Sequence, residues 1–266
     1  MTGFLKTYAA SGFDLQSTFD AAVVIPTICR PQLAQALRSV FTQDFDGRIQ
    51  VLIGIDKPEG DPALIEAVCA ELPAHCAVQV YYPGYSTSVR HGGVAPARDG
   101  GVLRCVLSYL ANTRYIAYLD DDNWWRRDHL RLLRHAIEDA DWAYALRWFV
   151  HPESHRPVAI DDWESVGPDR GVFRKKFGGF VDTNCLMIDR MHCGPILSNW
   201  NRPLPNDAKG MSADRNIFDV LRRNFRCATS GEPTVFYRLD PQDLLHPMRL
   251  TRLGLAYEEM AFPASA

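Results

Sequence analysis

Apolar residues in the first half of the chain fall into short continuous runs, separated by stretches in which they recur every three or four positions. The continuous runs predict buried β-strands at residues 21–27, 49–56, 77–82 and 114–119. The stretches with helical spacing predict α-helices at residues 31–42, 61–72 and 95–111. This alternation predicts an α/β fold with a mainly parallel central sheet flanked by helices on both faces.

The second half of the chain is less regular. Its periodicity predicts helices at 128–139 and 214–224 and strands at 142–150 and 181–189. Residues 151–176 are rich in charge, proline and glycine, which predicts a long excursion from the sheet. No linker divides the chain, so we expect a single domain spanning residues 1–266 with a more irregular C-terminal half.

Composition narrows the range of partners and compartments. Hydrophobic residues make up 47% of the chain and charged residues 23%, as in ordinary globular proteins. The formal net charge of −3 argues against bulk electrostatic binding of nucleic acid. The 7 cysteines form no Cys-x-x-Cys pair, which favours free thiols in a reducing cytoplasm. Neither a signal peptide nor a run of about 20 apolar residues is visible, so no transmembrane segment is expected.

The strongest chemical signal is a triplet of acids, Asp120, Asp121 and Asp122, that directly follows the apolar run 114–119. Ligands of parallel sheets bind beyond the carboxyl ends of the strands. Adjacent carboxylates repel one another unless they are solvated or paired with a cation, and hard oxygen ligands suit Mg²⁺ or Mn²⁺. A solvated turn that opens the next helix is the alternative. The position at the end of a buried strand favours the metal site.

Two further positions could contact a ligand at the same edge. Asp56 ends the strand 49–56, where a carboxylate could bind a base or ribose or could serve as a turn residue. Arg98 lies between two glycine pairs in the segment 92–101, where the backbone can approach a ligand closely. A surface residue at the start of a helix is the alternative. The segment matches neither G-x-G-x-x-G nor G-x-x-x-x-G-K-[ST], which argues against Rossmann dehydrogenases and P-loop enzymes.

Four segments in order, VVIPTICRPQLAQALRSVFTQ, VLIGID, ARDGG and YIAYLDDDNWW, resemble family 2 glycosyltransferases of the GT-A fold. The similarity covers about residues 21–125 and continues more loosely to about 224. It is greatest to the bacterial spore-coat-polysaccharide type, in which the corresponding strand ends in a similar TDDN segment. The resemblance implies a nucleotide-binding half at 20–125 and, at 126–266, an acceptor-binding half with a C-terminal extension.

The same resemblance implies roles for individual residues. The residues implied to hold the nucleotide are Thr27, Arg30, Asp56 and Arg98. Asp122 matches the acid that binds the metal, and Asp120 or Asp121 matches the acid that contacts ribose.

Three later residues match positions in the acceptor half or beyond it. Asp214 matches the catalytic base, although Asp is also a favoured helix N-cap residue. Asp182 matches a segment on the acceptor side, where it would touch sugar hydroxyls, and a plain strand-start acid is the alternative. His246 is a candidate third metal ligand, although a lone histidine is more often a surface or core residue. Trp163 and Trp200, in irregular polar stretches, are candidate acceptor contacts.

The implied function is transfer of a sugar from a nucleotide-diphosphate donor, with UDP or dTDP favoured, to a saccharide or lipid-linked saccharide. Mn²⁺ or Mg²⁺ would be the cofactor, and a single displacement would invert the anomeric carbon. The protein would be cytoplasmic, with peripheral contact at the inner face of the membrane if its acceptor is a lipid. A sugar-nucleotide pyrophosphorylase and a non-catalytic nucleotide-sugar or carbohydrate-binding protein are the alternatives. The first would need a glycine-rich loop after the first strand, where Thr27 to Arg30 has no glycine.

Overall fold

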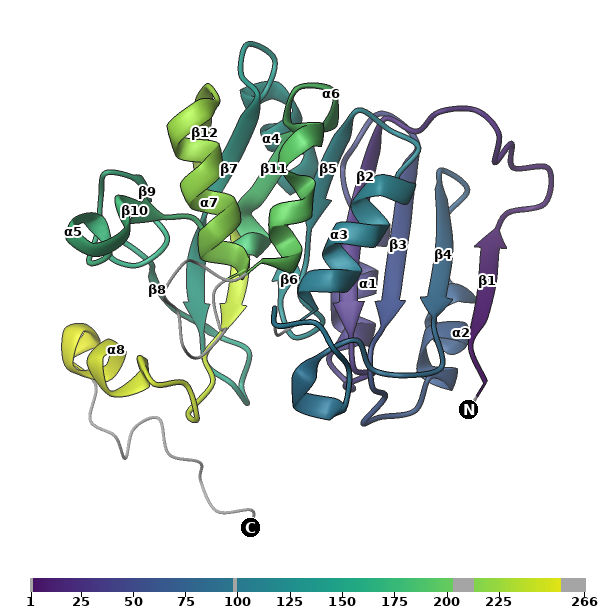
Figure 1. Cartoon of the computed structure of the whole chain (residues 1–266), viewed down its shortest axis with the longest axis horizontal. Coiled ribbons are helices and arrows are strands. Elements are labelled where there is room, and N and C mark those ends of the chain that lie inside the picture. Colours follow the sequence, from purple (N-terminus) through teal and green to yellow (C-terminus); the bar gives the residue numbers. More distant parts are fainter. Residues whose placement is uncertain (1, 98–99, 203–212, 255–266) are drawn as a thin grey trace.

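The computed structural model describes residues 2–97, 100–202 and 213–254 (Figure 1). Within these residues one large sheet contains ten strands. They are β1 (Phe4–Ala9), β2 (Ala21–Thr27), β3 (Ile49–Ile55), β4 (Cys76–Tyr82), β5 (Tyr115–Tyr118), β6 (Trp124–Trp125), β7 (Trp142–Val150), β8 (Pro157–Ile160), β11 (Leu186–Asp189) and β12 (Cys227–Arg238). A separate short pair is formed by β9 (Gly167–Pro168) and β10 (Gly179–Phe180).

The large sheet has the order β1-β4-β3-β2-β5-β11-β7-β12-β6, with β8 paired to β7. Strands β4, β3, β2 and β5 pair in parallel. Strand β11 is antiparallel to both β5 and β7, and β12 is parallel to β7, so β7 and β12 run in the same direction as β5. The mainly parallel sheet predicted from the sequence is confirmed. The carboxyl ends of β2, β3, β5, β7 and β12 therefore meet at one edge.

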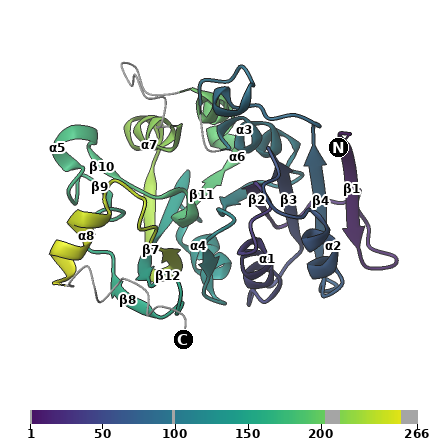
Figure 2. The same ribbon diagram turned by 90° about the horizontal axis from the view of Figure 1, so that it is seen from below.

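Helices cover both faces of the sheet, as predicted. The α-helices are α1 (Leu33–Phe41), α2 (Ala63–Cys69), α3 (Gly101–Leu110), α4 (His129–Ala136), α5 (Arg174–Phe177), α6 (Arg190–Cys193), α7 (Ala213–Asn224) and α8 (His246–Leu253). Three 3₁₀ helices are η1 (Val89–His91), η2 (Thr183–Cys185) and η3 (Gly194–Asn201). Helices α1, α2 and α4 lie on one face, and α3, α6 and α7 on the other (Figure 2). Strands β2 and β3 are buried along their whole length because both faces are covered.

Helix α3 differs from its prediction. The sequence pattern begins a helix at residue 95, whereas the helix begins at Gly101, after Gly100 in the left-handed region (φ 77°). The apolar residues Val106 and Leu110 are 48% and 46% exposed. Beside Leu103 and Leu107, the buried face carries Arg104 and Ser108, and the Ser108 hydroxyl lies 2.9 Å from that of Tyr118. A polar contact between helix and sheet therefore overrides the apolar pattern.

The predicted strand 181–189 also begins later, at Leu186, because the Asp182 side chain caps the 3₁₀ helix η2 by accepting a hydrogen bond from the Asn184 backbone N–H. The edge strand β1 and the long strand β12 were not predicted. In the described parts of the chain, no helix is long and apolar enough to cross a membrane.

Candidate functional site

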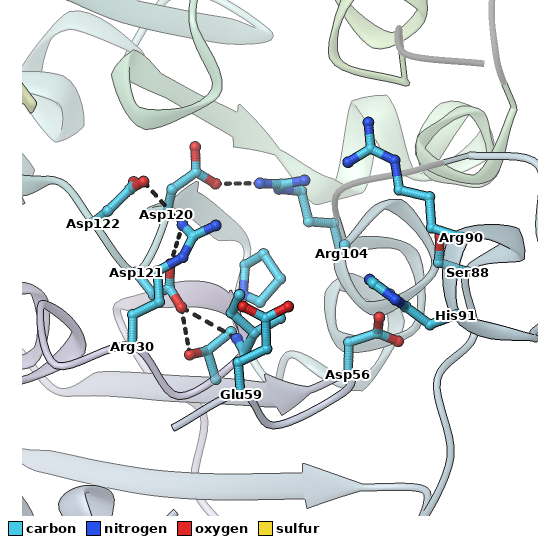
Figure 3. A pocket seen from close by; sticks show the side chains of 14 residues that line it. Arg30, Asp56, Glu59, Ser88, Arg90, His91, Arg104, Asp120, Asp121 and Asp122 are labelled. Carbon is cyan, nitrogen blue, oxygen red and sulfur yellow. Dashed lines mark hydrogen bonds and ion pairs between the residues drawn. The ribbon is translucent and has the colours of Figure 1, made fainter. Parts of the chain in front are cut away.

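A cavity of about 380 Å³ opens at the carboxyl ends of β2, β3 and β5 (Figure 3). Its volume falls within the range of small-molecule sites. It is lined by Pro26, Thr27, Ile28, Arg30, Asp56, Glu59, Ser88, Arg90, His91, Gly100, Arg104, Asp120, Asp121 and Asp122. Acidic and basic side chains face each other across it, as a ligand that carries both phosphates and hydroxyl groups would require.

The cavity brings together six of the residues predicted from the sequence: Thr27, Arg30, Asp56, Asp120, Asp121 and Asp122. Asp182, Asp214 and His246 are not among its lining residues. Arg98 lies outside the described residues. The basic side chains of Arg90, His91 and Arg104 were not predicted as site residues.

Asp121, at the end of β5, holds the loop after β2 in place through hydrogen bonds. It is 4% exposed and accepts hydrogen bonds from the Thr27 hydroxyl (2.6 Å) and the Ile28 backbone N–H (3.2 Å). The Cys29 backbone N–H donates to the Thr27 hydroxyl (2.8 Å), and Cys29 adopts a left-handed φ of 64° that is uncommon for a residue other than glycine. Burial raises the pKa of Asp121. These contacts give Thr27 and Asp121 a role in holding the rim of the cavity.

Asp122 and Asp121 both form ion pairs with the Arg30 guanidinium. One guanidinium nitrogen of Arg30, Nη1, lies 3.0 Å from Asp122 Oδ2 and 3.2 Å from Asp121 Oδ1. Burial, and then the charges of Asp120 and Asp121, raise the pKa of Asp122 to about 7, while Arg30 acts in the opposite direction. The acid triplet is therefore a cluster of like charges in which a further positive charge would be stabilising.

Asp120 is held on both carboxylate oxygens. Arg104 of α3 pairs with Oδ1, and the Asn184 side chain donates to Oδ2 (2.9 Å). Asn184 also accepts a hydrogen bond from the Asp120 backbone N–H (2.6 Å). Neither partner was predicted. For Arg104, the only indication in the sequence is that a charged residue shares a helical face with Leu107 and Ser108. For Asn184 the sequence gives no indication, because its partner Asp120 is distant along the chain.

Asp56 ties two loops together at the end of β3. It is 8% exposed and accepts hydrogen bonds from the Ser86 hydroxyl (2.8 Å) and from the backbone N–H (2.8 Å) and hydroxyl (3.2 Å) of Thr87. The loop it holds continues into η1, which carries Arg90 and His91 to the cavity (Figure 3). Asp56 therefore shapes the wall of the cavity through the chain that follows β4.

Asp214 is half-buried in the first turn of α7, where it accepts a hydrogen bond from the Arg215 backbone N–H (2.8 Å). Burial raises its pKa to about 6, although the Arg215 charge opposes the shift. The charges of Asp182 and Arg104 also act on it. Of these two residues, Arg104 also pairs with Asp120, and a pKa raised toward neutrality suits a group that exchanges a proton.

Asp182 is part of a buried ionic network. Arg147 is 1% exposed, and its guanidinium nitrogens lie 2.8 Å from Asp161, 2.9 Å from Glu164 and 2.7 Å from Asp182. Arg249 of α8 also pairs with Glu164, at 2.6 Å. Burial raises the pKa of Asp182, and the Arg147 charge lowers it. The network anchors α8 and the predicted acceptor-side acid to strand β7.

Replacing Arg147 by methionine is expected to lower the free energy of unfolding by about 3–5 kcal/mol, because Asp161 would remain as a buried charge without its cation. Urea denaturation measures the change. Arg38→Met removes an exposed pair with Glu71 and should leave the midpoint nearly unchanged. Equal midpoints for the two variants would contradict the structural importance of the network.

The remaining candidates lie apart from the cavity lining. His246 is a buried residue that begins α8. Trp200 is fully buried, with its ring 4.8 Å from that of Tyr118, so the expectation that it contacts an acceptor is wrong. Its indole packs against Tyr118 of β5, and the Arg104 guanidinium of α3 lies 5.6 Å from its ring centre. Trp163 is half-buried, with the Arg252 guanidinium 5.9 Å from its ring centre.

Comparison with solved structures identifies the architecture as the GT-A fold of glycosyltransferases, as the sequence predicted. TarS of S. aureus in complex with UDP aligns with a TM-score of 0.57 and 16% identity, over 87% of this chain and 64% of that chain. Its complex with UDP-GlcNAc aligns with a TM-score of 0.58 and 13% identity, over 85% and 60%. The mannosyltransferase PcManGT of Pyrobaculum calidifontis, in complex with GDP-Man and Mn²⁺, gives 0.56 and 13%, over 90% and 62%.

This chain therefore spans less than two thirds of the length of each of these proteins. No family model and no curated protein matches it.

Proposed function

We propose that this protein is a glycosyltransferase that transfers a sugar from a nucleotide-diphosphate donor to an acceptor hydroxyl. The observation that carries the proposal is the cavity at the ends of β2, β3 and β5, where Asp56 and the acid triplet face Arg30, Arg90 and Arg104. The proteins of similar fold, TarS and PcManGT, were solved in complex with UDP, UDP-GlcNAc or GDP-Man with Mn²⁺, which supports the same class of ligand here. Among glycosyltransferases, the motif order supports family 2 and the spore-coat type.

The cavity suits a divalent cation that is shared with a ligand. Mg²⁺ and related ions use one or two carboxylates together with substrate phosphates. Asp122 offers hard oxygen donors at the cavity, and the described residues contain no group of three or more His, Cys, Asp and Glu that could hold a metal by themselves. A divalent cation that the protein and the diphosphate of the ligand would bind together fits these donors. Asp122 would hold Mn²⁺ or Mg²⁺, which when bound offsets charge on the departing diphosphate, and His246 remains a candidate further ligand.

The other lining residues would bind the donor. Asp56 would recognise the nucleobase from the end of β3, and Asp120, fixed on both oxygens, would accept a hydrogen bond from a ribose hydroxyl. Arg30, whose side chain is 45% exposed, would neutralise the phosphates with its guanidinium. Thr27 and Asp121 would keep the rim in place, with Arg98 as an additional nucleotide contact. UDP and dTDP are the favoured nucleotides on the resemblance of the motifs.

Asp214 would act as the base of a single displacement. The acceptor oxygen attacks the anomeric carbon and forms the new glycosidic bond, while the bond from that carbon to the diphosphate oxygen breaks. The electron pair of the broken bond leaves with the diphosphate, and the acceptor proton passes to the Asp214 carboxylate. The configuration at the carbon inverts. Asp182 would lie on the acceptor side, and a saccharide or lipid-linked saccharide of polysaccharide biosynthesis would be the acceptor.

A thermal-shift screen of UDP, dTDP and GDP, with and without Mn²⁺, tests the proposal. A nucleotide at about 100 times its dissociation constant stabilises the folded state by about 2.7 kcal/mol, which corresponds to a shift on the order of 5 °C for a chain of this size. We expect one base to give this shift and to require Mn²⁺ for its full size.

Release of nucleotide from UDP-GlcNAc or GDP-mannose then separates an enzyme from a binding protein. Absence of any shift with all three nucleotides would contradict the proposal, and a shift without turnover of any donor would favour the non-catalytic alternative.

A further inference from the structure

Asn184 bridges the two acids that lie on either side of the junction between β5 and β11. Its side-chain nitrogen Nδ2 donates to Asp120 Oδ2 (2.9 Å) and to Asp182 Oδ1 (2.7 Å). Its side-chain oxygen accepts from the Asp120 backbone N–H (2.6 Å). The residue is fully buried, and its backbone carbonyl accepts a hydrogen bond from the Trp125 indole (3.0 Å). Every hydrogen-bonding group of its amide therefore has a partner.

This pattern of contacts requires a neutral amide. An amide offers two donor hydrogens and an acceptor on one planar group, so it can serve two carboxylates and a backbone N–H at once. A carboxylate of the same shape only accepts hydrogen bonds, and it would face Asp120 and Asp182 as a third negative charge. The charge of Asp120 already contributes to raising the pKa of Asp182, after burial. Asn184 thus stabilises two like charges at close range.

The register of the sheet explains how this residue reaches the site. Met187 pairs with Ala117 and Ile188 with Ile116 in the antiparallel ladder of β11 and β5. Continuing the ladder toward the cavity places Asn184 beside Asp120, in agreement with the hydrogen bonds between them. The pairing of β11 with β5 therefore brings the preceding 3₁₀ helix η2, and with it Asn184, next to Asp120. The Asn184 amide holds one oxygen of the Asp120 carboxylate, and Arg104 holds the other.

We propose that Asn184 is a positioning residue of the donor site, which fixes the direction of the Asp120 carboxylate toward the nucleotide. The inference rests on the proposed function, because it assumes that Asp120 contacts the donor. It predicts that loss of the amide weakens nucleotide binding beyond any loss of stability.

Asn184→Asp tests this with the smallest change of shape. Titration calorimetry with UDP and GDP in the presence of Mn²⁺ should show binding weakened by about 10- to 100-fold, the loss associated with a displaced charged hydrogen bond. Gln43→Glu is the matched control. Gln43 is a buried amide, outside the cavity lining, that donates to the carbonyls of Ser39 and Arg126 and accepts from the Leu130 N–H. It should lower the melting temperature and leave nucleotide affinity within about 2-fold.

The outcomes separate the inference from the function on which it rests. If the parent protein binds neither nucleotide, the proposed function fails and takes the role of Asn184 with it. If the parent binds and Asn184→Asp binds equally well, or if Gln43→Glu weakens binding as much, only the positioning role is overturned. Should Asn184→Asp fail to fold, Asn184→Ser decides, because its neutral hydroxyl cannot bridge both carboxylates. Unchanged affinity in that variant would overturn the role.

Discussion

Replacing Asp122 by asparagine is expected to reduce turnover of the nucleotide-sugar donor on the order of 10³-fold. The amide is similar in shape but carries no charge, so the carboxylate that would hold Mn²⁺ or Mg²⁺ is lost. A bound cation typically contributes several kcal/mol to stabilising charge on a leaving diphosphate, and each 1.36 kcal/mol is a factor of ten in rate. Nucleotide release from UDP-GlcNAc and GDP-mannose, followed across a series of Mn²⁺ concentrations, measures the effect.

The same variant should keep its fold, because Asp122 stands in an acidic cluster in which burial and like charges raise its pKa to about 7. Removing one negative charge relieves that repulsion. Asp44→Asn provides the control, since Asp44 is exposed on the surface and does not line the cavity. If Asp122→Asn retains the parent's Mn²⁺ dependence and rate, the metal assignment is wrong.

Replacing Asp214 by asparagine is expected to lower the rate by about 10³-fold while nucleotide affinity stays close to that of the parent. General-base catalysis contributes typically 10²–10⁴-fold, and an amide cannot accept the proton. Burial raises the pKa of Asp214 to about 6. The base works only when ionised, so the parent's rate should rise with pH through about 6 and level off above it. The variant should lack this step. Donor hydrolysis from pH 5 to 8, with water as acceptor, measures both profiles.

Stability supplies an independent check on Asp214. Its native pKa lies above the ordinary value of 3.8, so the ionised group costs stability above about pH 6, and this cost disappears as pH falls below the ordinary value. Asparagine removes the cost and can still accept the Arg215 N–H hydrogen bond. We therefore expect the variant to be at least as stable as the parent at pH 8. A less stable variant would contradict the raised pKa of Asp214, and a variant with the parent's pH profile of activity would contradict its role as a base.

The sequence was sufficient to predict the parallel half of the sheet. Strands β2 and β3 are buried on both faces, so their residues form the uninterrupted apolar runs that identify such strands. The same logic placed Asp56 and the acid triplet at the carboxyl ends, where the structure collects them around one cavity. The GT-A fold was implied by the resemblance of these segments, in their order, to family 2 glycosyltransferases.

Contacts between distant segments could not be predicted. Asn184 and Asp120 are 64 positions apart in the sequence. Arg147 contacts Glu164 and Asp182 because the fold brings β7 next to the segments that carry these acids. Trp200 lies in a polar stretch, yet it is fully buried because η3 packs on α3. Edge strand β1 also escaped prediction, because five of its six residues are exposed and no buried run marks it. Local pattern carries no information about these tertiary partners.

The antiparallel direction of β11 limits which segments of this protein can be exchanged in chimaeric proteins. Because this strand runs against β5, the segment that precedes it ends at the same edge as the acid triplet. Adding or deleting one residue between Asp182 and Leu186 would change the length of the 3₁₀ helix η2 and displace the bridging amide from Asp120. Chimaeras that exchange acceptor-half loops should therefore preserve this short interval, whereas the connection 151–156 between the paired strands β7 and β8, which lies outside the cavity lining, is the better place for a change of length.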